Sequence, residues 1–256
     1  MSDPREGNAI YYDLDESPLD DIPFYINRIA ADQSVLELGC GTGRTLIPLA
    51  TSCKEIVGVD YSKDMIERCL AKIPESLKYK CQVMTGDITR LRLDRKFDLI
   101  IAPYRVMQAL ETDSEVRGFL NSIANHLSPE GSCILNVFNP NRPKDEMLKS
   151  WPKVTETLCW EKKLEDGSTV AHFEFYEKVT TNPLVLFPHL IYRRYKDGQK
   201  TDELVQKIKM RCYYPDEFRS LLETSGFEIT EAWGGYKGEK YGEGRELVLR
   251  FCKPVV

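Results

Sequence analysis

Three glycines and two charged residues lie close together in the segment Glu37-Leu38-Gly39-Cys40-Gly41-Thr42-Gly43-Arg44. The apolar run 35–38 has the composition of a buried strand, so the segment lies where a first strand gives way to a first helix. Because glycine has no Cβ, such a loop lets a ligand approach the backbone closely. The N–H groups of the helix would point at that ligand. The segment therefore predicts a binding loop.

A second acidic residue, Asp60, ends the next apolar run, residues 55–60. Ligands of open parallel sheets bind at the carboxyl ends of the strands, so Asp60 is expected near the glycine loop. A carboxylate in this place accepts hydrogen bonds from both hydroxyls of a ribose that has no 2′-phosphate. The loop and Asp60 together predict a cofactor of the nucleoside type.

Two classes of nucleoside cofactor fit these features. Dinucleotide enzymes use the spacing G-x-G-x-x-G, in which the third glycine packs the helix against the strand. Here the spacing is G-x-G-x-G, and Arg44 stands where that third glycine would be. Glu37, two residues before the first glycine, suits a cationic ligand better than a pyrophosphate. A nicotinamide-dependent oxidoreductase stays open as an alternative.

The glycine segment resembles motif I of the class I S-adenosylmethionine-dependent methyltransferases. The resemblance continues through Asp60-Tyr61-Ser62, Gly86-Asp87-Ile88 and the run 97–100, and through the turn 127–131. These motifs follow one another in the family's order and cover about residues 30–140 and the terminal strands. The whole chain is similar to a group of mostly uncharacterised bacterial and archaeal methyltransferases, and more loosely to sugar-amine N-methyltransferases.

The resemblance implies S-adenosylmethionine as cofactor, with S-adenosylhomocysteine as product. In it Glu37 and the backbone of Gly39 and Gly41 hold the methionine part, and Asp60 binds the ribose. Around the adenine, the resemblance implies contacts from Tyr61, Met65, Asp87 and Ile88, with Asp87 accepting from the amino group. It also implies that several further residues lie near the cofactor: Cys40, Gly43, Gly86, Ala102 and Pro103. Arg44 is a possible partner for a carboxylate, and Tyr11 and Tyr12 belong to a cap.

The implied reaction is transfer of a methyl group to a nitrogen or oxygen of a small molecule by in-line displacement. Proximity supplies most of the rate of such a transfer, so no nucleophilic triad and no metal is expected. A base helps where the acceptor must lose a proton. The candidates for contact with the acceptor or for the base are Tyr104, Arg105, His172 and His189, and a packed or solvated role stays open for each.

Apolar strands alternate with helical patterns over residues 31–139, which predicts a Rossmann-like, doubly wound, mostly parallel α/β sheet. Residues 213–256 complete this domain with an antiparallel C-terminal strand. Residues 140–212 alternate between apolar and polar positions and contain the turns 165–168 and 196–199, each with an Asp-Gly pair. They predict an inserted antiparallel sheet of about four strands, whose apolar face would act as a lid. Residues 1–30 form the predicted N-terminal cap.

The composition is that of an ordinary globular protein, with 256 residues, 42% of them hydrophobic, and a net charge of −5. A negative net charge is unfavourable for a broad surface that binds nucleic acid, although Arg193, Arg194 and Lys196 form a small basic group. A methyltransferase acting on RNA or protein stays open for that reason. No apolar run is long enough to cross a membrane. The eight cysteines have no metal-site spacing, so we expect free thiols and a cytoplasmic protein.

Overall fold

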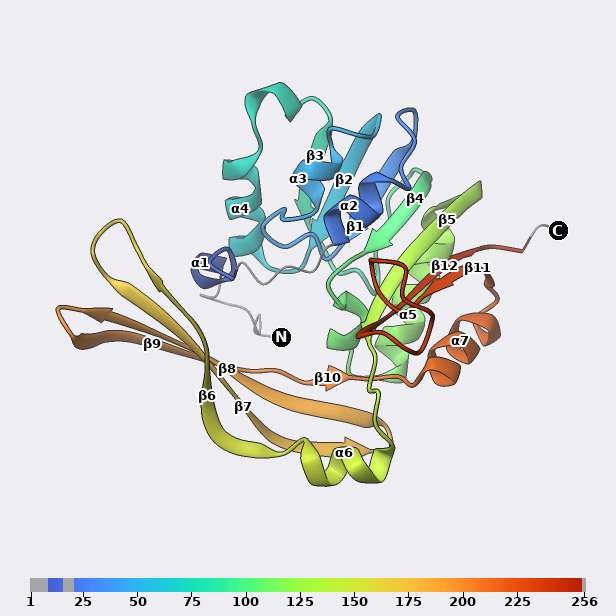
Figure 1. Cartoon of the computed structure of the whole chain (residues 1–256). Helices are drawn as coiled ribbons and strands as arrows, with labels where there is room; N and C mark the ends of the chain where they lie inside the picture. Colours follow the sequence, from blue (N-terminus) through green and yellow to red (C-terminus); the bar gives the residue numbers. More distant parts are fainter. Residues whose placement is uncertain (1–8, 16–20, 255–256) are drawn as a thin grey trace. The chain divides into compact units, whose positions relative to one another are not determined.

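The computed structural model describes residues 9–15 and 21–254, which form two compact units (Figure 1). The sheet unit comprises residues 21–141 and 213–254, and the inserted unit comprises residues 9–15 and 142–212. This division splits the predicted N-terminal cap, because helix α1 (Ala9–Tyr12) belongs to the inserted unit and helix α2 (Asp21–Ile26) to the sheet unit. Residues 1–8 and 16–20 of that cap lie outside the described residues.

The sheet unit contains a seven-stranded sheet in the order β11-β12-β5-β4-β1-β2-β3. Strands β1 to β5 pair in parallel, and β12 runs antiparallel to both of its neighbours. The predicted fold class is confirmed by this topology. The strands are β1 (Ser34–Leu38), β2 (Glu55–Asp60), β3 (Cys81–Thr85), β4 (Phe97–Ala102), β5 (Leu127–Phe138), β11 (Glu228–Trp233) and β12 (Glu246–Cys252).

Helices cover both faces of this sheet, and each face has its own apolar core. Leu36 lies in one core and its neighbour Val35 in the other, as the two-residue period of a strand requires. Helices α5 and α7 pack on the first face, and α2, α3 and α4 pack on the second. Their bounds are α3 (Leu46–Leu49), α4 (Lys63–Lys72), α5 (Asp113–His126) and α7 (Pro215–Thr224), with the 3₁₀ turns η1 (Glu75–Leu77) and η2 (Val106–Ala109). No helix of the described residues is both long and apolar enough to span a membrane.

Two segments of the sheet unit differ from the sequence prediction. The helix predicted to follow the glycine loop is α3, which has only four residues. Its N-terminus therefore contributes little to the binding loop that precedes it. The turn predicted over residues 127–131 lies within β5. There the pairing with β4 passes from Phe97↔Leu127 to Leu99↔Ser132, so the turn is an irregularity in a longer strand.

The inserted unit consists mainly of a second, antiparallel sheet, in the order β10-β8-β7-β6 with β9 also paired to β8. It has five strands instead of the four that we expected. Both Asp-Gly turns are confirmed as connections between strands, and Gly167 and Gly198 have φ values of +80° and +76°. The elements are α6 (Lys144–Ser150), β6 (Lys153–Lys163), β7 (Thr169–Thr181), β8 (Leu184–Lys196), β9 (Gln199–Lys207) and β10 (Met210–Arg211).

The fifth strand arises because the last part of the inserted sheet is divided into β9 and β10, with Ile208 and Lys209 between them. The break lies beside Pro188 of β8, whose carbonyl accepts from Ile208 N at 3.0 Å. Proline has no N–H to return, so the ladder is interrupted there. The predicted apolar side of β6 is also incomplete, because Val154 and Leu158 are 75% and 52% exposed while Trp160 packs inward.

Candidate functional site

The loop between β1 and α3 carries the three glycines, and all three have positive φ values of +75°, +52° and +82° at Gly39, Gly41 and Gly43. A Cβ on Gly39 would lie 2.5 Å from the side chain of Val106, and one on Gly43 would lie 2.6 Å from Cys69 Sγ. At these two positions glycine is therefore required by the backbone conformation and by packing within the protein. The loop lies between a strand and a helix, as predicted. Gly39 and Gly43 are needed there by the fold itself, whether or not a ligand binds.

Asp60 ends β2 beside this loop and is 3% exposed. Its Oδ2 accepts from Gly41 N at 2.8 Å, and its Oδ1 accepts from Ser62 N at 2.9 Å. Gly86 lies at the end of the neighbouring β3, where its N–H donates to the Asp60 carbonyl at 2.8 Å. The structure thus brings together the ends of β1, β2 and β3, as the parallel order requires.

Glu37 is the buried acid of the site, with 1% of its surface exposed. Its Oε2 has no hydrogen-bond partner in the described part of the chain. Burial raises the pKa of Glu37 well above its ordinary value, the charge of Arg44 opposes this rise, and the charges of Asp21 and Asp60 add to it. A buried carboxyl oxygen without a donor is costly, so this position fits a ligand that brings a cationic donor.

Arg44 is held by a residue that the sequence did not single out. Its guanidinium group donates to both carboxylate oxygens of Asp21, at 2.8 and 2.7 Å, and lies 5.0 Å from the centre of the Tyr104 ring. Asp21 is 1% exposed, and it begins helix α2. Arg44 therefore ties α2 to the glycine loop.

Two buried tyrosines near these charges were also missed. The hydroxyls of Tyr25, in α2, and Tyr236, between β11 and β12, have no hydrogen-bond partner among the residues described. Their ring centres are 6.4 Å apart. Burial raises the pKa of both hydroxyls, and the charge of Asp21 adds to the rise in each. We call Asp21, Tyr25, Glu37 and Tyr236 the Glu37 cluster; long-range contacts create it, and no local motif marks it.

The segment after β4 has an unusual backbone, in which Tyr104 and Arg105 have φ values of +59° and +65°. This left-handed conformation is costly for residues other than glycine, so neighbouring groups must hold it. Arg105 N donates to Asn136 Oδ1 at 3.2 Å, and the Arg105 guanidinium forms an ion pair with the buried Glu246. Arg105 therefore positions the segment, which leaves Tyr104, 38% exposed, as its candidate for contact with an acceptor.

The residues predicted around the adenine differ in accessibility. Tyr61 is 49% exposed, and Ile88 is partly buried against the core. Asp87 Oδ1 accepts from the backbone N–H and the hydroxyl of Thr89, at 2.8 and 2.6 Å. Met65 is completely buried, which favours a role in packing at that position.

The remaining predicted residues belong to the inserted unit. Tyr11 is buried there, with its ring stacked on Tyr192 and its hydroxyl donating to Asp202 at 2.6 Å, whereas Tyr12 is half-buried. Burial, with a smaller effect of Asp202, raises the pKa of Tyr11 to about 12. His189 Nε2 lies 2.7 Å from Glu177 Oε2, and His172 lies beside Tyr192, so the two histidines have separate surroundings. The cofactor and base roles of these residues stay predictions.

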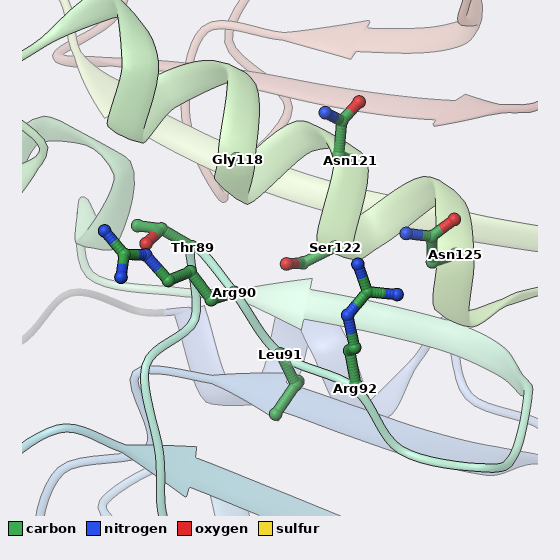
Figure 2. A pocket seen from close by; sticks show the side chains of 8 residues that line it. All are labelled: Thr89, Arg90, Leu91, Arg92, Gly118, Asn121, Ser122 and Asn125. Atoms are coloured by element: carbon green, nitrogen blue, oxygen red, sulfur yellow. The ribbon is translucent and has the colours of Figure 1, made fainter.

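A separate depression of about 410 Å³ lies between the loop 89–92 and helix α5. Figure 2 shows Arg90 and Arg92 from the loop and Asn121, Ser122 and Asn125 from the helix. None of the residues predicted for the cofactor lines this depression, so it is separate from the predicted cofactor site.

Comparisons with known proteins agree with this geometry. Residues 35–131 match a family described as "Methyltransferase domain". The cypemycin N-terminal methyltransferase of a Streptomyces species is 31% identical over 227 residues, which cover 85% of this chain and 82% of that protein. A dTDP-3-amino-3,4,6-trideoxy-alpha-D-glucopyranose N,N-dimethyltransferase of Streptomyces venezuelae is 27% identical over 43% of this chain and 44% of that protein.

A solved structure has the same fold. It is the S-adenosylmethionine-bound CalS10, an amino pentose methyltransferase from Micromonospora echinaspora, which superposes with a TM-score of 0.71 over 96% of both chains at 20% identity. The whole-length relative and the matched domain agree with the glycine loop, the acid after β2 and the sheet order. The chain therefore belongs to the class I S-adenosylmethionine-dependent methyltransferases.

Proposed function

We propose that the protein transfers the methyl group of S-adenosylmethionine to an aliphatic amine nitrogen of a small molecule. Two relatives support a nitrogen acceptor, because one is named an N-terminal methyltransferase and the other an N,N-dimethyltransferase of an amino sugar. An amine suits this reaction because its ammonium form loses a proton far more readily than an alcohol does, so that a weak base is enough. Membership of the family also favours this methyl donor over the dinucleotide alternative.

The observation that carries the proposal is the buried carboxyl oxygen Oε2 of Glu37, which has no hydrogen-bond partner among the described residues. The methionine part of the cofactor has an ammonium group, which is the cationic donor that this oxygen lacks. In our proposal Glu37 accepts from that ammonium group, and the unsatisfied hydroxyls of Tyr25 and Tyr236 add donors for the adjoining carboxylate. Charge-assisted hydrogen bonds of this kind are the strong ones in proteins.

Asp60 would bind the ribose hydroxyls. Its two oxygens already accept from Gly41 and Ser62, but a carboxylate offers about four acceptor sites. Tyr61 and Ile88 would enclose the adenine, with Asp87 accepting from its amino group. The backbone of Gly39, Cys40, Gly41 and Gly43, with Gly86, would shape the bottom of the site. Ala102, Pro103 and Tyr104 would line it beside the reacting centre.

When bound, the cofactor supplies a methyl group that is electrophilic because its sulfur is positively charged. The protein's part is to hold the amine nitrogen in line with that carbon and to exclude water. A bond forms from nitrogen to carbon, the carbon–sulfur bond breaks with its electron pair on sulfur, and the proton leaves the nitrogen. We assign contact with the acceptor to Tyr104, whose exposed ring is held in place by Arg44 and by the conformation of residues 104–105.

Calorimetric titration with S-adenosylmethionine tests the cofactor site. We expect Glu37→Gln to weaken binding about 10- to 100-fold, because a charge-assisted hydrogen bond contributes about 1.5–3 kcal/mol. The control variant Glu67→Gln changes an exposed acid of α4 and should leave the affinity unchanged. Equal affinities for S-adenosylmethionine in the two folded variants would show that Glu37 does not bind the cofactor.

A second assay tests the acceptor. Amino sugars, simple aliphatic amines and short peptides with a free N-terminus are incubated with the protein and labelled cofactor, and the products are located by tandem mass spectrometry. We expect added methyl groups on the amine, and no reaction with the N-acetylated form of the same molecule. Transfer to a hydroxyl of the acetylated form would show an oxygen acceptor, and transfer to peptides alone would favour the protein-directed alternative.

A further inference from the structure

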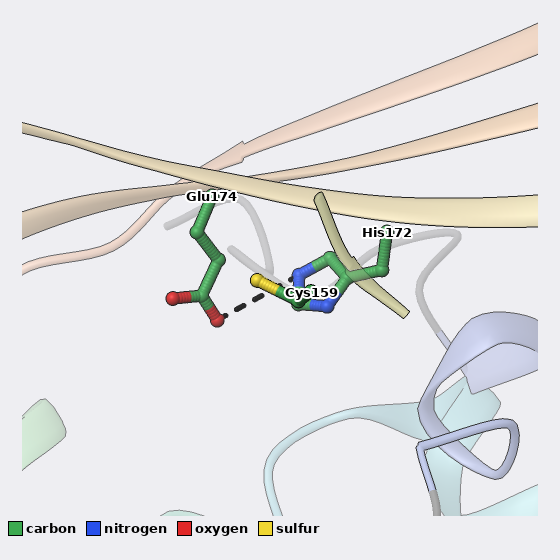
Figure 3. Close-up of side chains that lie close together, drawn as sticks. All are labelled: Cys159, His172 and Glu174. Carbon is green, nitrogen blue, oxygen red and sulfur yellow. Dashed lines mark ion pairs between the residues drawn. The ribbon is translucent and has the colours of Figure 1, made fainter. Parts of the chain in front are cut away.

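We propose that the inserted unit binds a divalent transition-metal ion of the zinc type through Cys159, His172 and Glu174. One donor atom from each residue lies within 4.8 Å of the other two. Figure 3 shows the Cys159 sulfur and the His172 imidazole side by side, with the Glu174 carboxylate next to them. Thiolate, imidazole and carboxylate are the three ligand types that zinc uses in proteins.

The strand pairing explains why these residues meet. His172 and Glu174 are two apart on β7, so their side chains lie on the same face of the sheet. Cys159 lies on β6, between the pairs Leu158↔Phe173 and Trp160↔His172, where the register shifts. A shift of this kind adds one residue to a strand and changes the direction of its side chain. All three donors therefore come from neighbouring strands of one sheet, which is a more rigid base than a loop.

His172 is the second, independent observation that points to a ligand. It is 3% exposed, and neither ring nitrogen has a hydrogen-bond partner within the described residues. Its ring is held in place by Tyr192, stacked with ring centres 4.6 Å apart, and by Trp160 at 5.3 Å. A buried polar group without a partner costs free energy, and coordination of a metal by one nitrogen would remove that cost.

The distances suit a shared ion better than a direct contact. His172 Nε2 and Glu174 Oε1 are 3.8 Å apart, which is too far for a hydrogen bond. Two ligands bound tetrahedrally at about 2.1 Å lie about 3.4 Å from each other, so a small contraction brings these atoms to the required separation. Cys159 is on the exposed side of the group, which gives an ion a path from solvent.

Neighbouring groups support the carboxylate ligand. The Tyr176 hydroxyl donates to Glu174 Oε2 at 2.6 Å, so the other oxygen, Oε1, is the one nearest His172. Hydrogen bonds to the ligands of a metal fix their orientation and raise the affinity. The carboxylate of Asp15 also acts on both Cys159 and His172, which adds a negative charge beside the group.

This proposal departs from the sequence prediction, which expected free thiols and no metal site. All eight cysteines are free, as expected, and five of them are buried. Cys159 differs because it is the exposed one and has an imidazole and a carboxylate within reach. The three ligands leave a fourth position for water or for another donor, and this open position is typical of a site with a chemical role.

The test is a titration of the full chain, freed of metal with a chelator, with cobalt(II) as the spectroscopic probe and zinc(II) as competitor. We expect one ion per chain, a near-ultraviolet band from thiolate-to-cobalt charge transfer, and loss of that band on addition of zinc. Cys159→Ser and His172→Gln should lower the affinity at least 10-fold, and Tyr176→Phe should lower it about 10-fold while keeping the band.

The matched control is Cys252→Ser, which changes another accessible thiol and should leave the affinity and the band intact. Circular dichroism and thermal melting check that each variant is folded. Should Cys159→Ser fail to fold, Tyr176→Phe and Glu174→Gln still test the site, because neither changes the sulfur. Substoichiometric binding, a spectrum without the sulfur band, or equal affinity in Cys159→Ser and Cys252→Ser would overturn the proposal.

Discussion

The buried carboxyl group of Glu37 lowers the stability of the cofactor-free protein, and in our proposal it strengthens the binding of the cofactor. The folded state holds its pKa well above the ordinary value of 4.5, first because the group is buried. A carboxyl with a raised pKa in the folded state stabilises the protein fully below its unfolded pKa, and this contribution is lost as the pH rises through the folded value. The residue that we propose to bind the cationic part of the cofactor therefore weakens the cofactor-free protein at neutral pH.

We expect Glu37→Gln to raise the free energy of unfolding of the cofactor-free protein at neutral pH by about 1–3 kcal/mol, the cost of an unsatisfied buried group. The wild type should lose stability as the pH rises above the ordinary carboxyl pKa, and the variant should lose less. Urea denaturation at pH 5 and pH 8 measures both effects, with Glu67→Gln as the exposed control. A variant that is less stable than the wild type at both pH values contradicts this account.

At the scale of elements, the segment from β4 to η2 depends on an ion pair with a distant strand. Arg105 holds its left-handed conformation through Glu246, the first residue of β12, and Asn136 Nδ2 donates to the same carboxylate at 2.8 Å. Removal of one partner from such a pair leaves a buried charge without compensation, which is costlier than the loss of the attraction itself.

We therefore expect Arg105→Met to destabilise the protein by about 2–4 kcal/mol, somewhat below the usual cost for a fully buried pair because Arg105 is partly exposed. Arg95→Met is the matched control, since Arg95 pairs with Glu55 where both side chains are about one-third exposed, and it should cost at most about 1 kcal/mol. The midpoints of urea denaturation of the two variants give the comparison. Equal midpoints would mean that Glu246 does not hold the segment.

Local signals explain which elements the sequence predicts well. The strand 55–60 is confirmed because it is determined by its own residues. Helix α4 is likewise bounded by local signals, the Ser62 cap and the nearby Pro74. The break between β9 and β10 depends instead on Pro188 of another strand, and the Glu37 cluster on contacts between α2 and the loop after β11. Such features cannot be read from one segment, because the partner that decides them is distant in the sequence.

At the scale of the whole molecule, the distribution of charge bears on whether the proposed acceptor is a small molecule or a nucleic acid. The net charge is −5, and Arg193 and Arg194, two of the three residues of the small basic group that left an RNA-directed enzyme open, are paired with acids of the inserted unit. Arg193 bonds to both Glu156 and Glu203 at 2.6 Å, and Arg194 bonds to Asp166 at 2.6 Å. Guanidinium groups that are paired in this way would have to break those bonds to contact phosphates, so they contribute little to a nucleic-acid surface.

We expect no saturable binding of a labelled transfer RNA or of single-stranded RNA, followed by fluorescence anisotropy at 0.15 M salt, because binding through phosphates depends on basic groups that release counterions. The double variant Arg193→Gln, Arg194→Gln should behave like the wild type in this assay and in amine methylation. Lowering the salt about tenfold would reveal a weak electrostatic attraction if one existed. Micromolar affinity with a steep salt dependence, abolished in the double variant, would return RNA to the candidate acceptors and would assign a docking role to strand β8 of the inserted sheet.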